Sequence, residues 1–111
     1  MLPEFAGLEF SADPALLRQK SRDFYWYSPI LKHQLDGKSA DLYARPRDEA
    51  EVLRVLSACR AARVPVTVRG GGTGNYGQCV PLEGGVVLDT TAMTAPLSLS
   101  DGVVEVEAGA K

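Results

Sequence analysis

The sequence predicts an α+β domain built on a βαβ unit with additional short strands. Residues 40–45 and 64–68 have the composition of strands, and residues 48–63 have the apolar spacing of a helix. Two further strand patterns, at 85–89 and 102–108, follow a glycine-rich loop. Because a helix of this length can cross over between strands of one sheet, we expect a right-handed crossover and two parallel strands.

A short helix is predicted near the N-terminus. The Asp13 side chain can cap this helix, and Pro14 occupies its first position, where a missing N–H does no harm. The helix is expected to extend to Lys20.

An aromatic arm follows this helix. Residues 24–27, Phe-Tyr-Trp-Tyr, hold half of the aromatic side chains of the chain. Ser28 and Pro29 after them are expected to break any helix. We interpret the cluster as a packing anchor against a larger body rather than as a ligand cage, and we leave it out of the predicted site.

The helix of the βαβ unit has signals at both ends. Asp48 is the predicted N-cap, and Glu51 lies at the reciprocal position of a capping box. A cationic last turn near Arg63 suits the negative end of the helix dipole. We expect an apolar stripe and a basic side, formed by Val52, Leu53, Leu56 and Cys59 and by Arg60 and Arg63.

The strands after the glycine-rich loop differ in character. Residues 85–89 are a short apolar run, typical of a buried strand. Asp89 at its end is interpreted as a turn former or a cap. Residues 102–108 alternate apolar and acidic side chains, which predicts an antiparallel strand with one face in water.

The composition indicates one globular domain at most. The chain has 111 residues, 45% apolar and 23% charged, and its net charge of −2 argues against nucleic-acid binding. No apolar run approaches the roughly 18 residues of a transmembrane helix, and no signal-peptide pattern is seen, so we expect a cytoplasmic protein. Cys59 and Cys79 lack metal-site spacing and are expected to be reduced thiols, and no metal ligand is assigned.

The glycine-rich loop, residues 69–78 with the sequence RGGGTGNYGQ, is the main functional signal. Glycine reaches positive φ at little steric cost, so successive glycines can turn several backbone N–H groups toward one anion. Such a loop directly after a strand predicts phosphate binding. A long surface turn between two strands is the alternative.

Two common nucleotide-binding motifs fit this loop poorly. Gly72, Gly74 and Gly77 match the Rossmann spacing, but residues 78–84 are too few and too rich in proline and glycine for the required helix. A Walker A loop needs Gly-Lys-Ser/Thr after its glycines, and none follows here. Phosphate binding by backbone N–H groups alone, between two strands, is the remaining prediction.

Three motifs follow one another in the second part of the chain: ADLYARPRDxxEV at 40–52, VPVTVRGGGTG at 64–74 and GGVVLD at 84–89. In this order they resemble the opening half of the PCMH-type FAD-binding domain of the vanillyl-alcohol oxidase family, in its glycolate oxidase and D-lactate dehydrogenase branch. The resemblance implies that residues 40–111 are the N-terminal portion, or first half, of an FAD-binding domain. Residues 1–39 carry no comparable motif and are assigned to an N-terminal helix and aromatic arm.

The resemblance also implies that the loop binds the pyrophosphate of FAD. The cofactor-binding residues are then Arg69, Gly70, Gly71, Gly72, Thr73, Gly74, Asn75, Tyr76, Gly77 and Gln78. Relatives with histidine at the position of Thr73 attach the flavin covalently, whereas the single histidine here is His33, so non-covalent FAD is expected. Arg69 either neutralises the diphosphate or ends the strand with its head group in water.

The implied enzyme is a flavin-dependent oxidoreductase, an oxidase or dehydrogenase of an alcohol or 2-hydroxy acid. No general base is visible, so no catalytic residue is assigned, and the 111 residues alone are expected to be inactive. The expected partners are the remainder of its own FAD and substrate domains, a small-molecule substrate and another copy in a homo-oligomer. The alternative is a small non-enzymatic α/β module that binds a phosphorylated ligand or a partner protein.

Overall fold

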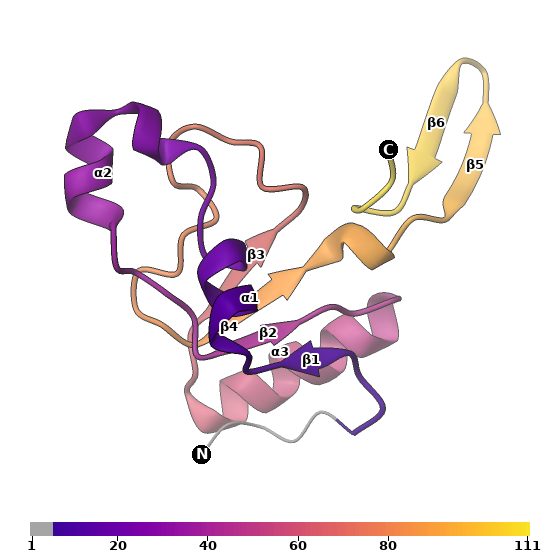
Figure 1. Ribbon diagram of the computed structural model, residues 1–111. Coiled ribbons are helices and arrows are strands. Elements are labelled where there is room, and N and C mark those ends of the chain that lie inside the picture. The colour runs from indigo at the N-terminus through magenta and orange to yellow at the C-terminus, as the bar shows by residue number, and fades with distance from the viewer. Residues whose placement is uncertain (1–5) are drawn as a thin grey trace.

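A mixed sheet of four strands organises the computed structural model, which describes residues 6–111 (Figure 1). The strands are β1 (Phe10–Ser11), β2 (Leu42–Ala44), β3 (Val66–Arg69) and β4 (Val86–Asp89), in the spatial order β1-β2-β4-β3. β2 and β3 each pair in parallel with β4, and β1 pairs antiparallel with β2. The predicted parallel strands are confirmed, but β4 lies between the two strands of the βαβ unit.

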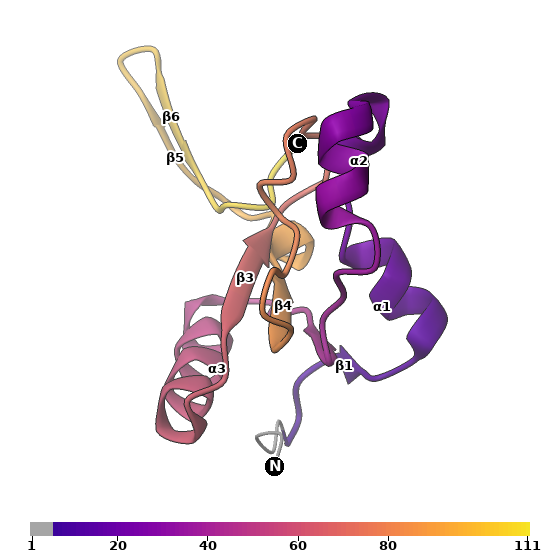
Figure 2. The same cartoon turned by 90° about the vertical axis from the view of Figure 1, so that its left-hand side faces the viewer.

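Helices cover both faces of this sheet. α3 (Glu49–Ala62) lies on one face and α1 (Pro14–Lys20) on the other (Figure 2). Neighbouring residues of β4 show the division, since Leu88 packs in the core cluster with residues of α3 and Val87 packs with Leu17 of α1. Successive side chains of a strand point to opposite faces, so each residue of β4 serves one of the two layers.

The predicted helix caps are confirmed at Asp13 and Asp48. Asp13 accepts a hydrogen bond from the Leu16 amide at 2.8 Å, and Asp48 accepts one from the Glu51 amide at 2.8 Å. The Glu51 carboxylate does not close the predicted capping box on Asp48. It accepts the backbone N–H of Arg47 at 2.8 Å instead, because the Arg47 side chain binds the same carboxylate and draws it one residue further back.

The buried side of α3 includes Val52 and Cys59 of the predicted stripe, but Val55 lies at its centre. Glu51, Val55 and Cys59, which are spaced by four residues, are buried against the sheet. The prediction that Leu53 and Leu56 belong to the buried stripe is wrong, since they are 56% and 40% exposed. Residues at i and i+4 share one face of a helix, so the stripe through Val55 turns these two leucines toward solvent.

A second N-terminal helix, α2 (Pro29–Leu35), corrects the prediction that Ser28 and Pro29 break any helix. Ser28 is its N-cap and accepts a hydrogen bond from the Leu31 amide at 3.2 Å, while Pro29 is the first helical residue. The pair therefore ends the preceding 3-10 turn, Tyr25–Tyr27, and begins a new helix.

The last two strands form a hairpin that projects from the rest of the chain (Figure 1). β5 (Pro96–Ser100), which is not predicted, pairs antiparallel with β6 (Val103–Val106). Val103 and Val104, neighbours on opposite faces of β6, are 68% and 59% exposed. The prediction of a single face in water is therefore wrong, because no other layer of residues 6–111 covers either face of the hairpin.

Candidate functional site

The glycine-rich loop leaves the carboxyl end of β3 and returns to β4 without a helix. Residues 78–84 contain only turns and irregular backbone. A Rossmann-type site requires a helix directly after the glycines, so this part of the chain does not form one. The observed strand-loop-strand connection agrees with phosphate binding by backbone groups alone.

Arg69, at the mouth of the loop, points into the protein. Its side chain is 7% exposed, and its guanidinium Nη1 donates to the carbonyl oxygens of Lys20 at 2.6 Å and Arg22 at 3.1 Å. Weaker bonds of 3.4 Å reach the carbonyls of Gly70 and Gly71. The alternative with the head group in water is therefore wrong. Arg69 ties the loop to the segment after α1 and brings a positive charge beneath it.

Asp23 is a second buried charge beside the loop, and the sequence offered no signal for it. Its side chain is 5% exposed, Oδ1 accepts the Tyr25 amide at 2.8 Å and Oδ2 accepts the Gly77 amide at 2.9 Å. The next residue also reaches the loop, since the Phe24 amide donates to the Gly74 carbonyl at 2.9 Å. The N-terminal segment thus fixes the far end of the loop as well as its beginning.

The middle of the loop keeps its amides free of protein partners. The backbone N–H groups of residues 71–75 donate no hydrogen bond to any residue from 6 to 111. Gly72 has φ of +70°, and a Cβ at this position would overlap the Arg69 guanidinium. Successive unpartnered amides in a glycine-rich turn are the arrangement that binds phosphate oxygens.

A hollow of about 300 Å³ lies against this part of the loop. Seven of the predicted cofactor-binding residues line it, namely Arg69, Gly70, Gly71, Gly72, Thr73, Gly74 and Gln78, together with Asp23, Val68 and Cys79. Asn75, Tyr76 and Gly77 do not line it. The Gln78 side chain accepts the Tyr76 amide at 3.2 Å, which holds the loop's far turn, while the Tyr76 ring is 75% exposed.

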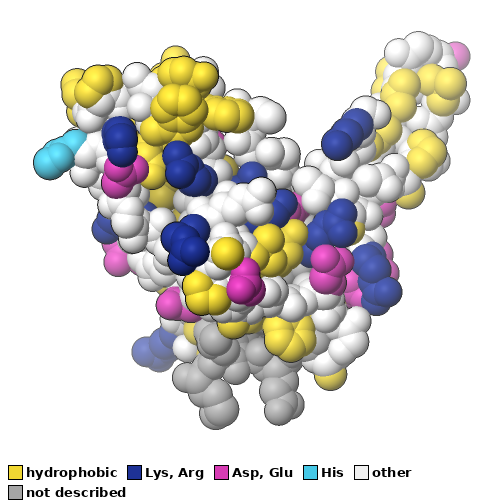
Figure 3. Space-filling view, in the orientation of Figure 1, with side chains coloured by type: hydrophobic (Ala, Val, Ile, Leu, Met, Phe, Trp, Pro, Cys, Tyr) yellow, Lys and Arg dark blue, Asp and Glu magenta, His cyan; other side chains and the backbone are white. Residues whose placement is uncertain are grey.

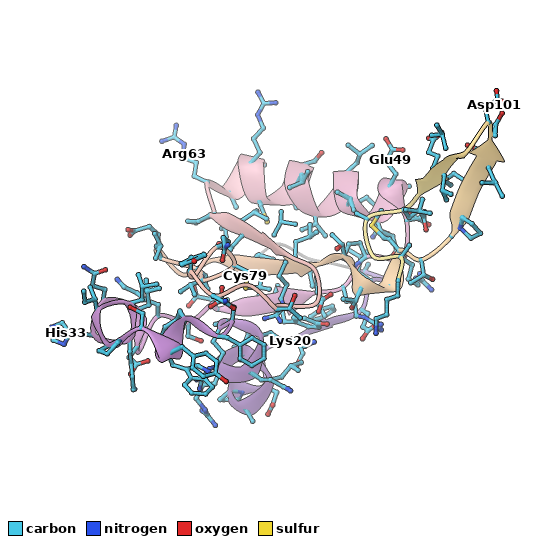
Figure 4. The ribbon with its side chains drawn as sticks, turned by 90° about the horizontal axis from the view of Figure 1, so that it is seen from above. Lys20, His33, Glu49, Arg63, Cys79 and Asp101 are labelled. Carbon is cyan, nitrogen blue, oxygen red and sulfur yellow. The ribbon has the colours of Figure 1, made fainter. Side chains whose placement is uncertain are left out.

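The cysteines and the histidine considered in the sequence analysis add no reactive group to the loop. Cys79 is 7% exposed, and burial raises the pKa of its thiol, as expected of a small filler. Cys59 and Cys79 are both free thiols. His33 lies on α2, at the end of the molecule away from the sheet (Figure 4).

Residues 6–111 contain neither a candidate metal-binding cluster nor a helix that could span a membrane. No group of three or more histidine, cysteine, aspartate or glutamate side chains in that range is placed to hold a metal ion. None of the helices in the same range is both long and apolar enough to cross a membrane.

The pattern of strand, glycine loop and strand corresponds to a known protein family. Residues 40–111 match the FAD binding domain family. The chain belongs to this family. Its cofactor is FAD, and the resemblance noted from the motifs of residues 40–89 is confirmed.

The curated relatives of this FAD-binding chain are much longer proteins. It is 41% identical over 64 residues to the glycolate oxidase subunit GlcD of Escherichia coli (strain K12), covering 53% of this chain and 13% of GlcD. It is 44% identical over 50 residues to D-lactate dehydrogenase of Archaeoglobus fulgidus, covering 45% and 11%. Mitochondrial D-2-hydroxyglutarate dehydrogenase of Bos taurus is 34% identical over 73 residues, covering 64% and 13%. The chain therefore spans about an eighth of these relatives.

Solved structures share the fold of this FAD-binding chain. Alkyldihydroxyacetonephosphate synthase superposes with a TM-score of 0.69 at 20% identity, covering 82% of this chain and 19% of the synthase. CrmK, a flavoenzyme of caerulomycin biosynthesis, superposes with a TM-score of 0.63 at 22% identity, covering 93% and 20%. The α+β fold class and its assignment to a PCMH-type FAD-binding domain are thereby confirmed.

Proposed function

We propose that residues 69–78 bind the diphosphate of FAD, and that the chain supplies the FAD-binding part of a flavin-dependent oxidoreductase. The unpartnered amides of residues 71–75, in a chain of the FAD binding domain family, are the observation that carries this proposal. These amides can donate hydrogen bonds to the phosphate oxygens, and the buried Arg69 guanidinium adds a positive charge beneath the same loop.

The loop residues have distinct roles in this proposal. Gly72 supplies the positive φ that turns the loop, and the exposed Thr73 side chain can donate its hydroxyl to a phosphate oxygen. Thr73 offers no nitrogen for attachment to a flavin, which favours non-covalent FAD. Asn75 and Tyr76 are exposed beside the amides and are free to contact the parts of FAD next to the diphosphate.

The substrate class follows from the curated relatives. Glycolate, D-lactate and D-2-hydroxyglutarate, which give three of those relatives their names, are all 2-hydroxy acids. We propose a substrate of this class, or a related alcohol. Bound FAD would supply the two-electron oxidation, and this chain holds and orients the cofactor. No catalytic residue is assigned within it.

The association and location of the protein are also proposals. The partners that fit best are the rest of its own polypeptide, in FAD and substrate domains, and a second copy of the chain. We also propose a cytoplasmic location, as the sequence analysis predicts. Cell fractionation and size-exclusion chromatography of the full gene product test these two points.

The loop assignment is tested with two glycine variants of the full gene product. Gly72→Val places a branched side chain against the Arg69 guanidinium at φ of +70°, so we expect FAD affinity to fall on the order of tenfold or more. Gly71→Ala is the matched control, because its Cβ meets only the Thr73 methyl group at 3.7 Å and it keeps the amide.

The measurement is FAD released on denaturation, together with titration of the apoprotein followed by flavin fluorescence. A wild-type gene product that never binds FAD would refute the function. FAD affinity in Gly72→Val equal to that of wild type would refute the loop assignment alone.

A further inference from the structure

A second hollow, of about 350 Å³, adjoins the phosphate loop. It shares Asp23, Arg69 and residues 71–73 of the loop with the first hollow. Its remaining wall comes from the N-terminal segment and includes the aromatic rings of Phe24 and Trp26. The two hollows are therefore contiguous, one lined by loop backbone and the other by aromatic side chains.

The aromatic wall, formed by Phe24 and Trp26, is held in place by ring contacts and by a backbone hydrogen bond to the loop. The Trp26 ring stacks on Tyr27 with centroids 4.1 Å apart, and Phe24 lies 6.5 Å from Trp26 in a tilted arrangement. The Phe24 backbone is hydrogen-bonded to the loop carbonyl of Gly74 at 2.9 Å. These contacts fix the rings relative to the free amides.

The same rings keep part of their surface open. Phe24 is 42% exposed and Trp26 is 39% exposed, although both are large apolar side chains. Figure 3 shows hydrophobic side chains gathered on the face that carries α2 and the segment before it. Arg22 and Gln19 complete the rim of the hollow, which adds a cation and an amide to an apolar wall. A flat, polar-edged ring is the chemical group that such a wall accommodates.

We propose that this second hollow binds a heteroaromatic ring of FAD, adenine or isoalloxazine, with Trp26 and Phe24 as its stacking surface. The inference rests on the proposed function, since the ring is carried into the hollow by a diphosphate bound at residues 71–75. A dinucleotide has a ring on either side of its diphosphate, so a ring site next to a phosphate site matches its chemistry. The aromatic arm is then part of the cofactor site and not only a packing anchor.

Two Trp26 variants of the full gene product separate ring stacking from simple packing. Trp26→Leu keeps apolar bulk without a flat ring, and we expect FAD to bind about tenfold more weakly. Trp26→Phe keeps a flat ring and should stay within about threefold of wild type. Leu53→Ala is the control, because Leu53 is an exposed apolar residue on α3 that does not line the hollow.

Binding to the apoprotein is measured by calorimetry with FAD, ADP, FMN and inorganic pyrophosphate. Weaker binding of ADP to Trp26→Leu identifies the ring as adenine, and weaker binding of FMN identifies it as isoalloxazine. Pyrophosphate should bind equally to wild type and variant, since it contacts only the loop. Either ring result supports the proposal.

The proposal is overturned if Trp26→Leu binds FAD, ADP and FMN as tightly as wild type does. If that outcome accompanies loss of FAD in Gly72→Val, the proposed function stands and only the ring site fails. If no protein binds FAD, the proposed function itself fails. If Trp26→Leu does not fold, the fluorescence of Trp26 in the wild-type protein is measured instead, as the difference between the wild-type signal and that of Trp26→Phe. Quenching of this fluorescence by ADP or FMN supports the ring site, and no quenching overturns it.

Discussion

Asp89 is a fully buried carboxylate at the end of β4, with 0% of its surface exposed. It accepts hydrogen bonds from the Tyr43 hydroxyl at 2.9 Å, the Lys20 ammonium at 3.2 Å and the Thr91 amide at 2.9 Å. The last bond confirms Asp89 as a cap after its strand. Lys20 ends α1, so this one carboxylate joins the N-terminal helix to the sheet (Figure 4).

The charge of Asp89 stabilises the fold. Burial raises the pKa of this carboxyl, but the hydrogen bonds from Thr91, Tyr43 and Lys20 outweigh it and hold the pKa below its usual value. Burial, with the hydrogen bond to Asp89, raises the pKa of the Tyr43 hydroxyl, which therefore stays a donor at neutral pH. A carboxyl with a lowered pKa contributes stability that is full above its unfolded pKa and is lost as pH falls through the folded value.

The lowered pKa of Asp89 leads to a prediction for the variant Asp89→Asn. We expect the variant to unfold more easily than wild type at pH 7 by about 1–3 kcal/mol, because an amide cannot replace the charge-assisted bonds. The difference should shrink as pH falls below about 4, because the carboxyl of the unfolded wild-type chain then takes up a proton that the folded carboxylate does not yet bind. Urea unfolding at pH 7 and pH 3 measures it. Asp101→Asn, at the exposed tip of the hairpin, is the control and should show no difference at either pH.

The hairpin β5–β6 is the element with the least support from the rest of the fold. Its base is tied by hydrogen bonds from the Glu107 amide to the Ala95 carbonyl at 3.0 Å and from the Gly109 amide to the Met93 carbonyl at 2.8 Å. Beyond this base its side chains are exposed on both faces. A two-stranded hairpin without a covering layer is marginally stable in water.

The rate of amide hydrogen exchange should therefore differ between the elements of the 111-residue chain. We expect amides of β5 and β6 to exchange far faster than those of β2 and β4, whose strands are buried between two helices. Amide exchange followed by mass spectrometry of peptides from 96–106 and 86–89 measures the contrast. Equal protection of the two peptides would contradict the prediction.

Signals that act within a few residues predicted their elements correctly. Asp13 and Asp48 each bond an amide three residues ahead, so the sequence spacing alone locates the helix start. The contact between Asp23 and Gly77 spans 54 residues, and no local pattern encodes it. The same limit applies to β4, whose place between β2 and β3 depends on pairing across the whole sheet.

The glycine-rich loop has some features that the local sequence predicts and others that depend on distant residues. Its glycines, its flanking strands and the absence of a following helix are local features, and they predict backbone phosphate binding. The direction of the Arg69 side chain is not local, because it depends on carbonyl groups of Lys20 and Arg22. The aromatic wall was left out of the predicted site for the same reason: only the folded chain brings Trp26 and Gly72 to the wall of one hollow.

At the scale of the whole molecule, the chain is elongated, with extents of 46 × 34 × 22 Å. The hairpin presents large exposed apolar side chains together, including Leu99 and Val104, which are 76% and 59% exposed and lie opposite each other across the two strands. Hydrophobic atoms line the projecting hairpin in the space-filling view (Figure 3). Both long edges of the hairpin also lack a pairing strand among residues 6–111. Exposed apolar strands with open edges favour association with another sheet or another copy.

We therefore expect the 111-residue chain, purified alone, to self-associate through the hairpin. The double variant Leu99→Lys, Val104→Lys should shift the chain toward monomer, because two like charges would lie opposite each other on the apolar face. Leu53→Lys is the control, since Leu53 is an exposed leucine on α3 and outside the hairpin, and its substitution should leave association unchanged. Sedimentation velocity over a range of concentrations measures the distribution. A wild-type chain that stays monomeric at high concentration would contradict the prediction, and equal loss of association in Leu53→Lys would place the contact elsewhere than on the hairpin.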